Sequence, residues 1–147
     1  MGKVSIEDPF LIGQHGVLSC AYDLEGCELY SVKWYKDGQE FYRFMPMPSM
    51  PDHMDMFKVA GVTIDQQKSH KNTLHLVNIE RNTEGIFRCE VSTESPHFYT
   101  VVEEVSVTVV GENCYVIKNN TDIFCLQFFL LGHLSLVCSL HIRWGTC

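Results

Sequence analysis

Two cysteines set far apart in the chain, with a tryptophan between them, constrain the fold more than any other feature. Cys20 follows Leu18 in one short run of alternating apolar and polar residues, and Cys89 follows Phe87 in another. Trp34 stands in a third such run between the two cysteines. Alternation with a period of two predicts strands that bury one face. The pattern therefore predicts an all-β chain in which both cysteines point into one core.

This order of residues is typical of the immunoglobulin sandwich, in which a disulfide joins two facing sheets and a tryptophan packs on it. We expect a Cys20–Cys89 disulfide, with Trp34, Phe87 and Leu76 in the core. Closing a loop of this size stabilises the fold by roughly 4 kcal/mol in the simple chain model. The alternative is a pair of buried free thiols in a cytosolic sandwich, which fits the tryptophan and the domain size less well.

The expected fold class is all-β, a variable-type immunoglobulin sandwich with an irregular or hydrophobic C-terminal tail. The domain is expected over residues 3–110 and the tail over 111–147. The dipeptide Asp37-Gly38 predicts a tight hairpin, and the strand after it marks the variable type, which has two additional strands. Strands are expected at residues 3–6, 17–22, 29–36, 40–44, 57–60, 62–67, 73–79, 87–92 and 99–110.

The segment 43–58 breaks the strand pattern because it combines three prolines with five methionines. Proline removes a backbone donor, so this segment cannot be a central strand. Methionine is common on adaptable binding surfaces, which suggests a contact loop. The favoured interpretation is an irregular edge that packs on its own sheet.

One position departs from the usual immunoglobulin pattern. A tyrosine two residues before the second cysteine normally ties down a corner of the fold with its hydroxyl group, but Phe87 stands there. We expect the corner to be held about 1 kcal/mol less firmly, the net contribution of one hydrogen bond.

The flat face of the sheet that contains Trp34 is the expected recognition surface. Rigid aromatic side chains beside an arginine are the residue types that dominate protein interfaces. Strand alternation, together with the loop before the last strand, gives the partner-binding candidates Lys33, Tyr35, Tyr42, Phe44, Arg88, Glu90, Phe98 and Tyr99. The alternative is that these aromatic residues are scattered over the surface and do not form an interface.

Over residues 17–110 the chain resembles the beaten path family of insect neuronal cell-surface proteins, in its first immunoglobulin domain only. The runs 18–26, 29–37, 40–44, 61–65 and 87–92 carry the resemblance. Its most specific parts are Tyr22-Asp23-Leu24-Glu25-Gly26 and Val32-Lys33-Trp34-Tyr35-Lys36-Asp37. The resemblance implies cell recognition in axon guidance, with a sidestep-like immunoglobulin protein as partner. The family pattern of a second domain does not continue after Val110.

Other function classes are disfavoured. A formal net charge of -7 and a pI near 5.4 leave no basic surface for nucleic acid. No catalytic triad or phosphate-binding glycine loop stands out, so we expect neither an enzyme nor a cofactor. The histidines lack metal-ligand spacing, and we expect no metal site. They are His15, His53, His70, His75 and His97, and tail residues Cys125, His133, Cys138, His141 and Cys147 lack the paired short spacings of zinc sites.

The cysteine content and the sequence pattern place the domain outside the cell or on its surface. No apolar leader follows Met1, so we expect the chain to be incomplete, either because it lacks an upstream exon or because it is a fragment. After the Cys20–Cys89 pair, five cysteines remain, and Cys27 either pairs with Cys114 or stays free. The pairing of Cys125, Cys138 and Cys147 is open.

The tail allows several interpretations. Residues 123–142 have about the length that spans a bilayer, although polar residues interrupt them. The alternatives are a membrane anchor, a lipid-anchor signal, and a mis-joined exon or translated intron, which is favoured. Asn119-Asn120-Thr121 is a glycosylation sequon. The competing functions for the whole chain are a secreted immune-type domain that binds through its loops and a truncated product without function.

Overall fold

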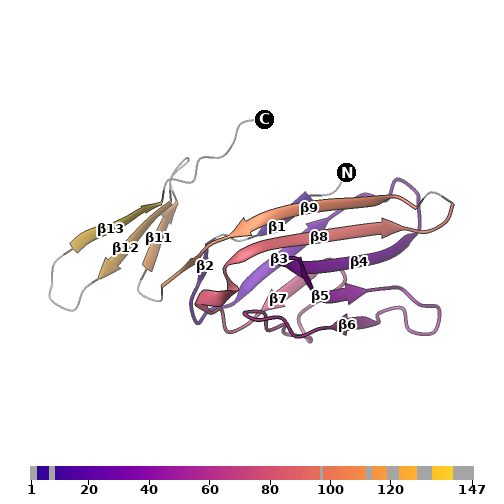
Figure 1. Ribbon diagram of the computed structural model, residues 1–147, viewed down its shortest axis with the longest axis horizontal. Coiled ribbons are helices and arrows are strands. Elements are labelled where there is room, and N and C mark those ends of the chain that lie inside the picture. The colour runs from indigo at the N-terminus through magenta and orange to yellow at the C-terminus, as the bar shows by residue number, and fades with distance from the viewer. Residues whose placement is uncertain are drawn as a thin grey trace. The chain divides into compact units, whose positions relative to one another are not determined.

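The computed structural model describes residues 3–6, 9–96, 98–111, 114–118, 123–128 and 134–140. Contacts among Cα atoms divide the chain into two units, Met1–Val109 and Val110–Cys147. The described part of the first unit consists of strands and loops, apart from one short 3-10 helix, η1 (Arg81–Thr83). Figure 1 labels the strands along the chain.

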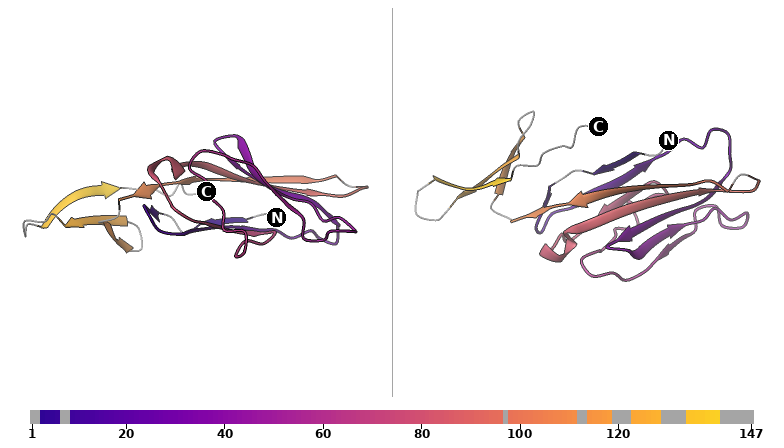
Figure 2. Two further views of the ribbon diagram at one scale, coloured as in Figure 1. Left: turned by 90° about the horizontal axis from the view of Figure 1, so that it is seen from below. Right: turned by 45° about the horizontal axis from the view of Figure 1, so that its top comes forward.

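The larger sheet of the first unit has five antiparallel strands. Their order is β6 (Met54–Met56), β5 (Gln39–Phe44), β4 (Leu29–Lys36), β8 (Gly85–Thr93) and β9 (Thr100–Val107). The opposing sheet has the order β1 (Lys3–Ile6), β3 (Gly16–Ala21) and β7 (Thr73–Leu76), and β2 (Phe10–Leu11) pairs with β10 (Val109–Val110). Figure 2 shows the two layers edge-on. The predicted all-β sandwich is confirmed.

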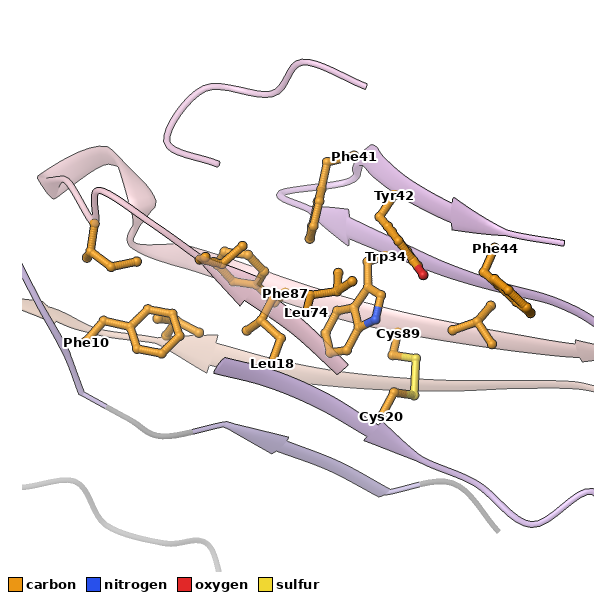
Figure 3. Packing of buried hydrophobic residues seen from close by; sticks show 14 of the residues in the cluster. Phe10, Leu18, Cys20, Trp34, Phe41, Tyr42, Phe44, Leu74, Phe87 and Cys89 are labelled. Atoms are coloured by element: carbon orange, nitrogen blue, oxygen red, sulfur yellow. A yellow bond between two sulfur atoms is a disulfide. The ribbon is translucent and has the colours of Figure 1, made fainter. Parts of the chain in front are cut away.

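The core lies between the two sheets and is centred on the disulfide. Cys20 in β3 and Cys89 in β8 are bonded across a sequence separation of 69 residues. Trp34, Phe87 and Leu76 are all 0% exposed, as the alternation predicts. Figure 3 shows the indole of Trp34 beside the disulfide. Burying an aromatic side chain of this kind contributes about 2–3 kcal/mol to stability. The core therefore stabilises the sandwich independently of the residues on its surface.

Three hydrogen bonds hold the corner before β8, where the usual tyrosine hydroxyl is missing. The hydroxyl of the fully buried Thr83 donates to the carbonyl of Gly61 at 2.7 Å and accepts from the Glu80 amide at 3.0 Å. Arg81 Nη1 donates to the Val109 carbonyl at 3.1 Å. These bonds tie the corner to Gly61 and Val109.

Two predicted strands are wrong in the structure. The sixth strand is Met54–Met56 instead of residues 57–60, because Met54 and Met56 lie opposite Phe44 and Tyr42 in the sheet. Residues 62–67 form one isolated bridge, between Ile64 and Leu76, where a strand was expected. Two backbone bonds still hold this segment against β7 and its exit, Asp65 N–H to the His75 carbonyl and Val77 N–H to the Thr63 carbonyl.

The predicted hairpin between β4 and β5 is present. Asp37 and Gly38 have φ values of 49° and 80°, as the two central residues of a type I′ turn require. The Asp37 carboxylate accepts the Ile86 amide at 2.9 Å and the Lys36 ammonium at 2.7 Å. These bonds, the one from Lys36 most strongly, hold the pKa of Asp37 below its usual value.

We expect Asp37 to make the fold sensitive to acid. A carboxyl whose pKa is lower in the folded state stabilises the fold above its unfolded pKa, near 4, and loses this effect as the pH falls through the folded pKa. Asp37→Asn keeps an acceptor for Ile86 and tolerates the left-handed backbone, but it cannot titrate. Urea unfolding between pH 2 and 6 should therefore show a shallower acid dependence for the variant, and identical slopes would contradict this assignment.

The second unit is described by three antiparallel strands, β11 (Cys114–Lys118), β12 (Ile123–Phe128) and β13 (Leu134–Leu140). Residues 123–142, the candidate membrane span, thus contain two strands in their described part. Within the described ranges, no helix has the length and apolarity to cross a bilayer. The glycosylation candidate Asn119 lies outside the described residues.

Candidate recognition face

The side of the five-stranded sheet that points away from the core carries charged and aromatic side chains, and we call it the outer face. Lys33 lies opposite Glu90, and Tyr35 lies opposite Arg88. Residues directly opposite each other in antiparallel strands project on the same side of the sheet. The outer face comprises Lys33, Tyr35, Glu40, Arg43, Arg88, Glu90, Val102 and Glu104.

Two cross-strand contacts order the centre of the outer face. The Arg88 guanidinium lies 4.2 Å from the centroid of the Tyr35 ring. Beside it, Lys33 Nζ lies 3.6 Å from Glu90 Oε1, and both side chains are about four-fifths covered. A cation over an aromatic ring gains about 0.5–1 kcal/mol at an accessible site. The four predicted residues therefore form a pre-arranged group with restricted side-chain freedom.

The placement of Tyr42 and Phe44 on this face was wrong. Tyr42 is 0% exposed and Phe44 is 4% exposed, and both point into the core. The cause is a bulge between Trp34 and Tyr35, where the pairing passes from Trp34–Tyr42 to Tyr35–Glu40 and leaves Phe41 unpaired. One extra residue turns every side chain beyond it to the other side of the sheet.

The sequence carried a signal for this bulge. Phe41 and Tyr42 are adjacent aromatics, and strict alternation would leave one of them exposed while turning Arg43 toward the core. Burying an unpaired guanidinium costs more than a local bulge, so the extra residue is the better solution. Phe41 uses its buried position to pack edge-on against Phe87, with ring centroids 5.9 Å apart.

Two residues that were not predicted join the outer face, Arg43 because of the bulge and Glu40 because it lies opposite Tyr35 just before the bulge. Arg43 donates from Nε and Nη2 to the two carboxylate oxygens of Glu40, at 2.7 and 3.0 Å. This bond raises the pKa of Arg43 further. The same guanidinium lies 5.6 Å from the centroid of the Phe57 ring. A bidentate arginine–carboxylate pair has a fixed orientation, so it presents a defined shape to a partner.

Electrostatics around Tyr35 keep its hydroxyl protonated. Burial raises the pKa of Tyr35 above its usual value, and the charges of Glu90 and Glu40 raise it further, against smaller opposing effects from Arg88 and Arg43. The hydroxyl therefore remains a hydrogen-bond donor across the physiological pH range. A tyrosine in this state offers both an apolar ring and a polar group at its tip.

The Arg88 guanidinium has no hydrogen-bond acceptor among the residues that the structure describes, and its Nε is buried. In the neighbouring strand β9, Glu104 lies opposite Arg88, but the two side chains do not bond to each other. Buried polar groups normally have partners, so an arginine left with free donors needs an explanation.

Exposed aromatics gather near the end of the sheet where β8 meets β9. Phe98 is 70% exposed, Tyr99 62% and Tyr30 43%. The Thr93 amide donates to the Tyr99 carbonyl and the Tyr99 amide donates to the Thr93 hydroxyl, both at 2.9 Å, and these bonds close the hairpin. Phe98 adopts a φ of 48°, which is unusual for a bulky residue. Tyr30 was missed because β4 has a second irregularity, between Leu29 and Ser31, that breaks the alternation.

Within the described ranges, no three His, Cys, Asp or Glu side chains come close enough to hold a metal ion. Of the two expectations for Cys27, the structure shows the free thiol, which is half-buried.

Comparisons with known proteins agree with this architecture. The family model described as immunoglobulin domain matches residues 9–102, which is more than half of the chain. A comparison with curated proteins finds no match.

Three solved structures illustrate the likeness of fold. The V domain of amphioxus IgVJ-C2 is 18% identical with a TM-score of 0.53, covering 69% of this chain and 97% of that one. Domain 1 of VCBP3 from Branchiostoma floridae is 14% identical with a TM-score of 0.54, covering 76% and 97%. A mouse coronavirus receptor-binding domain complexed with its murine receptor is 14% identical, with a TM-score of 0.57 and coverage of 89% and 69%.

Proposed function

Because the chain belongs to the immunoglobulin domain family, in which the fold generally serves recognition rather than catalysis, we propose that it binds another immunoglobulin-superfamily protein through its outer face. The contact between Arg88 and Tyr35 is the observation that carries the proposal. Tyrosine and arginine are the commonest residues at which interfaces concentrate their binding energy. Here they are already stacked, so less side-chain entropy is lost on binding.

The free donors of Arg88 indicate what the partner offers. The buried Nε is out of a partner's reach, so a carboxylate or a backbone carbonyl would bind at the outer nitrogens of the guanidinium. The charged pairs Lys33–Glu90 and Arg43–Glu40 flank this centre. Charges around an interface centre favour correct partners and orientations more than they add affinity. In this proposal Arg88 and Tyr35 supply most of the binding energy, and the charged pairs around them supply selectivity for the partner.

The finer proposal concerns the partner and the setting. The resemblance to the beaten path family supports a sidestep-like partner, a role in neuronal wiring and a position outside the cell or on its surface. Tyr35 and Lys33 belong both to the outer face and to the Val32–Asp37 run that carries much of the resemblance. Attachment to a membrane through residues 123–142 is part of the same proposal.

A binding screen tests the proposed function. The full chain would be secreted behind a supplied signal peptide, multimerised, and tested against a panel of immunoglobulin-superfamily ectodomains that includes sidestep-like proteins. We expect a specific hit whose binding is competed by the unmultimerised chain. A folded chain that binds no member of the panel would contradict the proposal.

Recognition through the loops is a second candidate, because Phe98 holds a left-handed backbone at the tip of the β8–β9 hairpin while its ring is largely exposed. Strained, exposed residues are often found at ligand contacts. In this case Phe98→Ala would abolish binding to a secreted or immune-type target, and Tyr35→Ala would leave it unchanged.

A further inference from the structure

Strand β9 borders the five-stranded sheet, and within the described residues it pairs with a strand on one side only. That strand is β8. Strand β1 comes near β9 but pairs with β3 in the opposing sheet, and β2 pairs with β10, beyond the end of β9. Figure 1 shows β9 at the border of the sheet. The free side of a border strand carries backbone groups that can pair with a further strand.

Two hydrogen bonds show which backbone groups of β9 point away from β8. The Thr93 amide donates to the Tyr99 carbonyl at 2.9 Å, so this pair is hydrogen-bonded. Bonded and non-bonded pairs alternate along an antiparallel ladder, so every second residue after Tyr99 also bonds to β8. From the other side, the Phe10 amide donates to the Thr108 carbonyl at 3.0 Å, which follows the same alternation. The outward backbone groups therefore belong to Thr100, Val102, Glu104 and Ser106.

These outward groups are accessible and unpaired in the part of the chain that the structure describes. Thr100, Val102 and Glu104 are exposed residues, and no backbone bond from another segment reaches their outer side. Water solvates such groups, so the fold does not require a partner here. A strand of another protein can replace this water with a ladder of backbone hydrogen bonds, which is the mode of recognition called strand addition.

The start of β9 is apolar on both of its faces. Val101 lies opposite the buried Val91, on the core side of the sheet. Val102 lies opposite Glu90, on the outer face. Even so, Val101 is 40% exposed and Val102 is 45% exposed, so the opposing sheet leaves part of Val101 uncovered. β-Branched residues pack well against a neighbouring strand, and an exposed apolar border favours the addition of one.

Two carboxylates follow the valines, one on each face of the strand. Glu103 lies opposite Cys89 on the core side, and Glu104 lies on the outer face. In the described ranges neither carboxylate forms an ion pair. A second copy of this chain would bring the same carboxylates and a further formal net charge of -7 to the border. Like charges oppose that pairing, so the charges favour a basic partner.

We propose that residues 100–104 bind an extended basic segment of another protein, which joins the five-stranded sheet as a sixth strand beside β9. In strand addition, backbone hydrogen bonds supply affinity and side chains supply specificity. The backbone bonds would come from Thr100, Val102 and Glu104. This surface does not depend on the contact between Arg88 and Tyr35 that carries the proposed function, and it goes beyond that function.

The order of side chains along β9 predicts their order in the added segment. Residues directly opposite each other in antiparallel strands project on the same side of the sheet. Apolar residues are therefore expected opposite the two valines, and lysine or arginine opposite the two glutamates. Antiparallel pairing is slightly more stable per residue than parallel pairing. Read from its N-terminus, the added segment should thus have two basic residues followed by two β-branched apolar residues.

The probe for the test is a peptide of this pattern, threonine-lysine-lysine-valine-valine-threonine, acetylated and amidated at its ends. Amide hydrogen exchange of the full chain would be followed by NMR with and without the peptide. The outward amides of Thr100, Val102 and Glu104 should exchange at least about tenfold more slowly with the peptide, because each gains an acceptor. A control peptide with glutamate in place of lysine should leave their exchange unchanged.

Val102→Pro tests the role of the backbone. Proline lacks the outward N–H, but the bonds between β9 and β8 remain because that N–H takes no part in them. We expect the labelled peptide to bind at least about tenfold more weakly by fluorescence anisotropy, since one donor is lost and the ring obstructs the ladder. The matched control, Val102→Thr, keeps the N–H and the branched shape and should bind like the unsubstituted chain.

A Glu103→Gln, Glu104→Gln double variant tests the role of charge. It keeps the backbone and nearly the same side-chain shape, and we expect weaker peptide binding that depends less on salt concentration. Thermal unfolding would verify that each variant is folded. If the proline variant is not, the double variant and the exchange measurement keep the test decisive.

Three outcomes would overturn the proposal. The first is unchanged exchange of the three outward amides at the highest soluble peptide concentration. The second is equal peptide binding by the folded variants and the unsubstituted chain. The third is slower exchange of the same amides in the chain alone as its concentration rises, because the added strand would then come from a second copy.

Discussion

Replacing Cys20 with alanine is expected to lower the free energy of unfolding by about 4 kcal/mol, which is the entropic contribution predicted for a crosslinked loop of this length. The disulfide connects residues 69 positions apart and joins the two sheets through β3 and β8. Without it the unfolded chain gains conformational freedom, and the Trp34 ring loses a packing partner. Natural domains have total stabilities of about 5–15 kcal/mol, so the variant should be secreted poorly.

Cys27→Ala is the matched control for this prediction. It removes a thiol that is free and only half-buried. Its urea midpoint should remain close to that of the unsubstituted chain. Equal midpoints for Cys20→Ala and Cys27→Ala would show that the Cys20–Cys89 bond does not hold the sandwich together.

Gly61→Ala is the second substitution with a large expected effect, because Gly61 packs against the corner before β8. A Cβ at this position would overlap the backbone carbonyl of Asn82 and lie 2.7 Å from the Thr83 nitrogen. These are backbone atoms, so no side chain can move aside. The φ of 77° adds strain for any residue other than glycine. Together these effects should cost roughly 3–5 kcal/mol, because overpacking and backbone strain each cost about 1–3 kcal/mol.

Gly26→Ala separates the two contributions. Gly26 also has a positive φ, 87°, but nothing lies within 4 Å of a Cβ built there. This variant should lose only about 1 kcal/mol, the cost of the left-handed backbone. Urea unfolding of both variants would measure the difference. If Gly61→Ala were no less stable than Gly26→Ala, the tight packing of the corner would be refuted.

The fold could be predicted because its determinants are local. Cys20, Trp34 and Cys89 each lie in a run with clear alternation, and the Asp37-Gly38 turn fixes where the chain reverses. Each of these signals depends on residues within one strand or one turn. The strand at residues 62–67 failed because its sequence alternates like a strand, yet it makes only one bridge to Leu76.

The outer face was predictable only in part. Alternation alone placed Lys33, Tyr35, Arg88 and Glu90 correctly, because β4 and β8 are regular over that length. It failed beyond Phe41, where the energetic preference for an exposed Arg43 inserts a bulge. A bulge results from competition between two side chains for the core, and a pattern with a fixed period cannot represent that competition.

The corner before β8 shows a similar limit of prediction from sequence. The change from tyrosine to Phe87 suggested a weaker corner, because the usual hydrogen bond is absent. The corner also has a bond from Thr83, whose partner Gly61 lies 22 positions away in the sequence. Contacts of this range depend on how the chain folds back, so single-residue patterns do not reveal them.

The most direct test of the proposed outer face measures the affinity of Arg88→Ala for an ectodomain identified by the binding screen. The substitution removes the group stacked on Tyr35 and its free donors, at a position that makes no ion pair among the described residues. We predict binding at least about tenfold weaker, as expected for a hot-spot arginine, with a nearly unchanged melting temperature. Unchanged affinity in the folded Arg88→Ala variant would contradict recognition through the outer face.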